Sequence, residues 1–129
     1  MAWLLDNKLL VAGVAIGGLL LALVSGVVVF SNVKRVAPVS WGMYGDVNHS
    51  AGVAIDGYDV MAYRRGGPVV GSSEHSMNYA GTTWYFSSEE NLGAFAVAPA
   101  TFAPQFGGYC SYAVSKGFTA ASNPTVFAL

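Results

Sequence analysis

The sequence has few charged residues and no excess of positive charge. Only 10% of its 129 residues are Asp, Glu, Lys or Arg, and the formal net charge at pH 7 is -1. Soluble globular proteins carry about a quarter charged residues, so this chain departs from that class. Because no basic field is present to attract phosphate backbones, we expect no nucleic-acid partner.

Cysteine is also scarce, and phosphate-binding motifs are absent. Cys110 is the only cysteine, which excludes an internal disulfide framework. A lone thiol persists on either side of a membrane, so it does not identify the compartment. Neither GxGxxG nor the P-loop spacing occurs, and the pair Gly107-Gly108 is therefore not a phosphate loop.

What the sequence does contain is one long apolar run, residues 9–30. It includes no charge, Asn, Gln, His or Pro, and Ser25 is its only polar side chain. A helix of this length extends about 33 Å, enough to cross a hydrocarbon core of about 30 Å. The apolar region of a signal peptide is usually about 7–15 residues long, and so small a soluble protein could not cover such a helix. We therefore predict a transmembrane helix over residues 9–30, with residues 1–8 as its N-terminal flank.

The flanking charges leave the orientation of this helix open. Lys8 and the α-amine precede the run, and Lys34 and Arg35 follow it, so positive charge is nearly balanced. Trp3 and Trp41 are expected at the two membrane–water interfaces, which fixes the depth of the helix and not its direction. The lipid bilayer is the first expected partner.

Small residues recur along the run at a spacing of four. Gly13 and Gly17 form a GxxxG motif, and Gly18, Ala22 and Gly26 continue the pattern. Residues four apart share a helix face, so these positions predict a groove where other transmembrane subunits could pack closely. The alternative is that Gly and Ala are simply common in membrane helices. The run has no His, Met, Cys or acidic residue, so we expect it to bind no cofactor or metal and to relay no protons.

Residues 31–52 are rich in Gly, Ser, Asn and Pro and predict a surface linker. A compact domain is expected over residues 53–129. Alternation over residues 59–64 predicts a short strand, and residues 76–86 predict a hairpin with Gly81 in its turn.

Two helices are expected in the same domain. The first spans residues 89–97, where Ser87 to Glu90 matches a capping box, Leu92, Phe95 and Ala96 form an apolar stripe and Pro99 ends the helix. The second spans residues 108–115. Most of the many aromatic residues must build the core, because a domain of about 75 residues needs large side chains to bury enough area.

Several motifs resemble the YHS-domain family, in the form found in small exported bacterial proteins. They are GYDVMAY at residues 57–63, WYFSSEEN at 84–91 and FAPQFGGYC at 102–110, with Phe95 and Pro99 in the same order. The resemblance covers about residues 53–125. It implies a small α+β module, and it implies that the domain faces the periplasm.

Cysteine-bearing members of this family have been linked to metal binding, but this chain departs from their pattern. A Cys-pair site cannot form within one copy, because Cys110 is the only cysteine. The chain also ends soon after Pro124, where many members continue, so we expect a trimmed domain or one that a partner surface completes.

Three residues could still form a metal site. Cys110, His75 and His49 are ligand types for zinc or copper(I), although their spacing matches no known pattern. A buried, small apolar side chain is the simpler interpretation of Cys110, and a solvated linker residue is the simpler interpretation of His49.

No other group of residues predicts catalysis. Asp56 and Asp59 are close in sequence, and Glu89 and Glu90 are adjacent, and paired carboxylates can share acid–base catalysis. Acids at the start of a helix are more simply explained by the helix macrodipole. Ser87 and Ser88 are interpreted as helix caps, because no histidine lies nearby in sequence to activate them.

These observations predict an α+β protein with one N-terminal transmembrane helix and a small YHS-like domain made of a β-hairpin and short helices. The function we expect is that of a non-enzymatic accessory subunit of a larger complex in the inner (cytoplasmic) membrane. The alternative is a membrane-tethered domain that binds copper or zinc. The sequence leaves open whether the complex is respiratory, photosynthetic or an oxygenase.

Overall fold

The computed structural model describes residues 1–126 and divides the chain into two units. The first unit, Met1–Arg35, consists of the helix α1 (Ala2–Lys34). The helix ends where Arg35 adopts the left-handed conformation (φ 52°, ψ 42°) and donates its N–H to the carbonyl of Ser31. α1 is thus longer than the predicted span of residues 9–30, because both polar flanks continue the helix.

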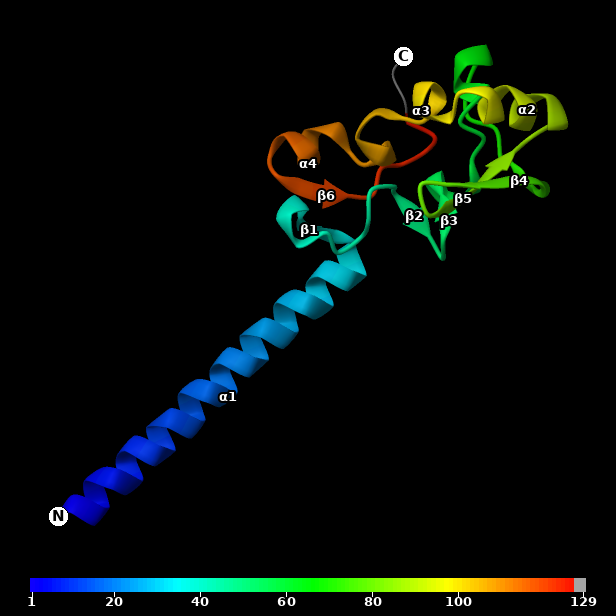
Figure 1. The fold of residues 1–129 in the computed structure, drawn as a ribbon. Helices are drawn as coiled ribbons and strands as arrows, with labels where there is room; N and C mark the ends of the chain where they lie inside the picture. The colour runs from blue at the N-terminus through cyan, green and yellow to red at the C-terminus, as the bar shows by residue number, and fades with distance from the viewer. Residues whose placement is uncertain (127–129) are drawn as a thin grey trace. The chain divides into compact units, whose positions relative to one another are not determined.

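The second unit begins at Val36 and is a mixed α+β domain (Figure 1). Its elements, in chain order, are β1 (Val36–Pro38), η1 (Val39–Trp41), β2 (His49–Ser50), β3 (Val53–Ala54), η2 (Ile55–Gly57), η3 (Ala62–Arg65), β4 (Ser72–Tyr79), β5 (Thr82–Phe86), α2 (Glu89–Val97), α3 (Pro99–Phe102), η4 (Gln105–Gly108), α4 (Ser111–Ser115) and β6 (Phe118–Ala120), where η denotes a 3₁₀ helix.

Two sheets organise this unit. β1 and β6 pair antiparallel in one sheet, and the other has the order β2-β3-β5-β4, with β3 and β5 parallel. In Figure 1 the small sheet lies with α4 at one end of the unit, and the larger sheet lies with α2 at the other. The fold is therefore α+β, as predicted.

The hairpin and the first helix are confirmed. β4 and β5 are joined by Ala80 and Gly81, whose φ values of 50° and 73° are both left-handed, as in a type I′ turn. β4 begins at Ser72, four residues earlier than predicted. α2 has the predicted bounds of residues 89–97, and the hydroxyl of Ser88 caps it by accepting the Asn91 N–H. The predicted capping box of Ser87 with Glu90 is wrong, because the Ser87 hydroxyl donates to Asp59 instead.

The core lies where β5 meets α2. Trp84 and Phe86 from β5 pack on Phe95 from α2, with ring centroids 5.2 and 5.1 Å apart. The buried cluster around these rings is completed by smaller apolar side chains: Val47, Ala54, Ile55, Val60 and Met61. Aromatic residues thus build much of the core, as expected.

The strand predicted over residues 59–64 is wrong. Residues 62–65 form the 3₁₀ helix η3, and Val60, Met61 and Ala62 are all buried. Three consecutive buried side chains do not fit a strand with one solvated face, because successive side chains of a strand point to opposite faces.

Secondary structure and buried residues also occur within the stretch that was predicted to be a linker. Residues 31–34 belong to α1, and β1 lies inside the predicted linker of residues 31–52. Val47 and Asn48 in the same stretch are buried. The predicted helix over residues 108–115 is shortened to α4, because η4 occupies Gln105–Gly108.

Candidate functional site

The small residues of α1 form the first candidate site. All five predicted positions lie in the helix, and a Cβ built on Gly13, Gly17, Gly18 or Gly26 would meet no other atom within 4 Å. The space above these glycines is therefore open to another helix.

These positions do not form one groove. At about 100° of rotation per residue, the pair Gly13 and Gly17 is centred about 160° away from the trio Gly18, Ala22 and Gly26. α1 therefore carries two small-residue faces on nearly opposite sides. The spacing in the sequence predicted a single groove, whereas helical geometry divides the small residues between two faces.

Over residues 9–30, the remaining surface of α1 is apolar all round, apart from Ser25. The segment Asp6–Lys34 is long and apolar enough to span a membrane or to be a signal sequence, and none of its most apolar part is buried within the protein. An unburied helix of this kind requires lipid or other apolar helices around it.

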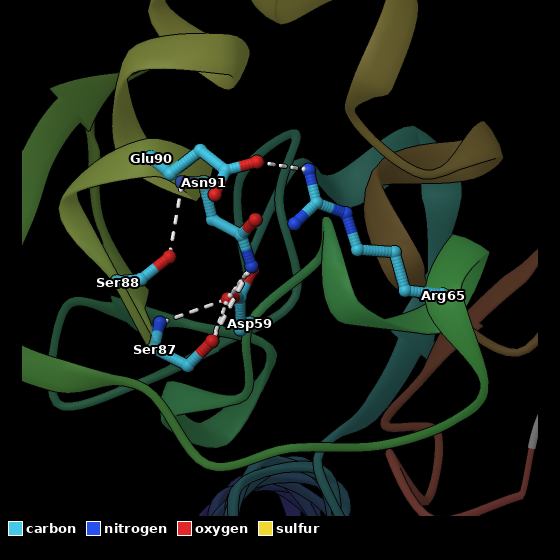
Figure 2. Close-up of polar contacts among 6 residues, drawn as sticks. All are labelled: Asp59, Arg65, Ser87, Ser88, Glu90 and Asn91. Carbon is cyan, nitrogen blue, oxygen red and sulfur yellow. Dashed lines mark hydrogen bonds and ion pairs between the residues drawn. The ribbon is translucent and has the colours of Figure 1, made fainter.

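The second candidate site is a buried polar cluster around Asp59 (Figure 2). The Asp59 side chain is completely buried, and its carboxylate accepts four hydrogen bonds. The Met61 N–H donates to Oδ1 at 2.8 Å. The Ser87 N–H (2.8 Å), the Ser87 hydroxyl (2.6 Å) and the Asn91 side-chain amide (2.7 Å) all donate to Oδ2.

The backbone conformation of the three residues 55–57 places Asp59 next to its hydrogen-bond donors. Ile55, Asp56 and Gly57, just before it, all have positive φ, with values of 51°, 51° and 83°. This is an uncommon conformation, above all for a β-branched residue such as Ile55. The reversed chain then places Asp59 beside the end of β5 and the start of α2, where Ser87 is located.

The hydrogen bonds determine the charge state of Asp59. Burial raises the pKa of its carboxyl, but the bonds from Ser87, Asn91 and Met61 together lower it more, so the pKa lies below its usual value of 3.8. The group is therefore an anion at neutral pH whose acceptor capacity is largely used. This arrangement suits a structural clamp between three segments and not a general base.

Two neighbours of the clamp have further features. Arg65 from η3 reaches the Glu90 carboxylate of α2 at 2.9 Å, as Figure 2 shows, and both side chains are largely exposed. Within residues 1–126, the side-chain oxygen of Asn91 is buried and accepts no hydrogen bond.

From the sequence alone, Ser87 and Asn91 were not identified as hydrogen-bond partners of Asp59. The only available signal was their place in the WYFSSEEN motif.

The three predicted metal ligands are not brought together. His49 lies in β2 and His75 in β4, at opposite edges of the four-stranded sheet, and Cys110 precedes α4. His75 lies inside β4, four residues before the end of the strand. Among residues 1–126, no group of three or more His, Cys, Asp or Glu side chains is arranged to hold a metal ion.

Comparison of the chain with protein-family models, with curated proteins and with solved structures gave no match.

Proposed function

We propose that the chain is a non-enzymatic, single-pass accessory subunit of a larger membrane complex. In this proposal α1 crosses the inner membrane and packs against other transmembrane subunits, while the second unit is a YHS-like domain on the periplasmic side. The observation that carries the proposal is the apolar part of α1, residues 9–30, which is apolar on every side, while none of the most apolar part of the helix is buried within the protein.

The small-residue faces support a packing role. Without a hydrophobic driving force inside lipid, helices associate through close backbone approach, which Gly and Ala permit. Gly13 with Gly17 on one side and Gly18 with Gly26 on the other allow α1 to contact two neighbouring helices at once. A helix inserted between two subunits would use both faces.

Features of the second unit support a role without catalysis and an assignment to the YHS type. Asp59, the completely buried acid, is engaged by four donors, and His49, His75 and Cys110 do not converge. The motif order of residues 57–110 supports the YHS assignment. The same resemblance to exported proteins supports the periplasmic location.

Native gel electrophoresis of gently solubilised membranes tests the packing role. Gly13→Leu with Gly17→Leu fills one face and should release the protein from its complex. Val14→Phe with Ile16→Phe adds similar bulk between the two faces and is the matched control, expected to leave the complex intact. If the double glycine variant co-migrates with its neighbours as the native protein does, the packing role is wrong.

A second experiment tests the orientation. In a Cys110→Ser background, Val97→Cys places a thiol on an exposed part of α2. A membrane-impermeant maleimide should label this thiol in intact cells whose outer membrane has been made permeable. Labelling only after the inner membrane is broken would place the domain in the cytoplasm.

A further inference from the structure

An exposed apolar surface lies on the second unit beside its first strand. Val39 and Trp41 of η1 and Phe118 of β6 are exposed, with Trp41 at 53%. They are neighbours, because Pro38 pairs with Phe118 across β1 and β6 and the Val39 N–H donates to the Gly117 carbonyl at 2.8 Å.

A cation and a further aromatic ring lie on α4 and the turn after it, which pack next to β6. The Lys116 amine lies 5.7 Å from the centre of the Tyr112 ring, and Tyr112 on α4 is exposed. Lys116 also directly precedes the Gly117 that bonds to η1. We call the five residues the basic aromatic face: Val39, Trp41, Tyr112, Lys116 and Phe118.

The charges of the surrounding segments are all of one sign. Residues 36–44 and 109–126 supply every element of this face. Their one charged residue is Lys116, and Lys34 and Arg35 directly precede the first segment in the sequence. Neither segment contains an aspartate or a glutamate, so all seven acids of the chain lie elsewhere. A surface of this composition complements an anionic layer.

The position of these residues in the chain indicates that the anionic layer is formed by lipid headgroups. β1 starts at Val36, directly after the end of α1, and Trp41 follows within a few residues. If α1 spans the membrane, these residues leave it at the level of the lipid headgroups, where Trp and Tyr are enriched and Lys side chains can extend toward phosphate.

We propose that the basic aromatic face rests in the headgroup layer of an anionic bilayer and holds the domain against the membrane. Trp41, Phe118 and Tyr112 enter the interface, and Lys116 contacts lipid phosphate. This inference rests on the proposed membrane-spanning role of α1. It adds a second attachment, which would restrict the orientation of the domain above its complex.

Site-directed spin labelling of the full chain in nanodiscs of mixed neutral and anionic phospholipid tests the proposal. In a Cys110→Ser background, a nitroxide is attached to Phe118→Cys, to Val39→Cys as a second probe of the face, or to Val97→Cys as the exposed control on α2. Leu21→Cys in α1 is the internal reference. Accessibility to oxygen, which concentrates in lipid, is compared with accessibility to a water-soluble nickel chelate.

Labels at 118, 39 and 21 should favour oxygen, and the label at 97 should favour the nickel chelate. If position 21 favours oxygen while 118 and 39 behave like 97, the membrane attachment is wrong and α1 still spans the bilayer. If 118 and 39 are shielded from both reagents, protein covers the face and the inference is also overturned. If position 21 favours nickel, both the proposed function and this inference fail.

The charge dependence provides a second test. Lys116→Gln should reduce the docked population at position 118 about fivefold relative to the undocked one, the expected effect of losing one cation near an anionic surface. Lys8→Gln, a cation at the other end of α1, should leave it unchanged. Equal docking in purely neutral nanodiscs would contradict the role of anionic lipid.

Discussion

Replacing Asp59 with Asn tests the assignment of the buried clamp. Asn keeps the volume of the side chain and removes its charge. Its oxygen can take the place of Oδ2, where three donors meet, but its NH2 group then faces the Met61 N–H, the donor that Oδ1 accepts at 2.8 Å. The Met61 N–H is left without an acceptor, and the new NH2 group is a further buried donor beside it.

The loss in the free energy of unfolding can be estimated from these contacts. An unsatisfied buried donor costs about 1–3 kcal/mol, and each of the three remaining hydrogen bonds weakens by about 1 kcal/mol when the acceptor loses its charge. Since such contributions are not strictly additive, we expect the free energy of unfolding to fall by about 3–5 kcal/mol. Small domains have a total stability of about 5–15 kcal/mol, so the effect is large.

Urea denaturation of the full chain in mild detergent measures this loss. Near-UV circular dichroism follows Trp84, which packs on Phe95 in the core of the domain. Glu90→Gln is the control, because it removes an ion pair between exposed side chains and should cost about 1 kcal/mol or less. If Asp59→Asn is no more destabilising than Glu90→Gln, the clamp does not stabilise the fold.

The same carboxylate predicts a pH dependence. Because the pKa of Asp59 is lower in the folded than in the unfolded protein, its contribution is fully present above the unfolded value, near 3.8. It is lost as the pH falls below that value and through the folded pKa. The native protein should lose more stability on acidification than Asp59→Asn does. Parallel pH profiles would contradict the lowered pKa.

Three further substitutions test the packing of the domain in the same unfolding assay. Gly107→Ala should destabilise the domain strongly, because an added Cβ would overlap the Asp46 carbonyl and the φ angle of Gly107 is left-handed. A variant of native-like stability would contradict this close approach. Phe95→Ala should cost about 3–5 kcal/mol, and a loss below about 1 kcal/mol would mean that the ring is not central to the core. Tyr109→Phe removes a hydroxyl that donates to the Tyr44 carbonyl at 2.6 Å, and should cost about 0.5–1.5 kcal/mol; an unchanged midpoint would mean that this bond contributes nothing.

Local patterns in the sequence predicted the elements that are determined locally. The apolar run, the turn at Gly81 and the cap at Ser88 each depend on residues within a few positions of one another. Of these elements, α2 has the expected bounds, whereas α1 and β4 extend beyond theirs.

Elements that depend on distant partners could not be predicted in this way. β1 is a strand because Ala37 pairs with Thr119, 82 positions later, and neither short segment has a periodic pattern of its own. Asp59 likewise lies 28 positions from Ser87, and the sequence gives no sign of their contact except the motifs that contain them. The separation of the small residues into two faces required only helical geometry.

Whether α1 is a retained membrane anchor is decided by the intact mass of the protein, expressed in a bacterial host and recovered from carbonate-washed membranes. If α1 is an anchor, the membrane pellet holds the uncleaved chain of 13.4 kDa. A shorter chain that lacks α1, recovered in the soluble fraction, would show that the helix is a signal sequence and that α1 does not anchor the protein.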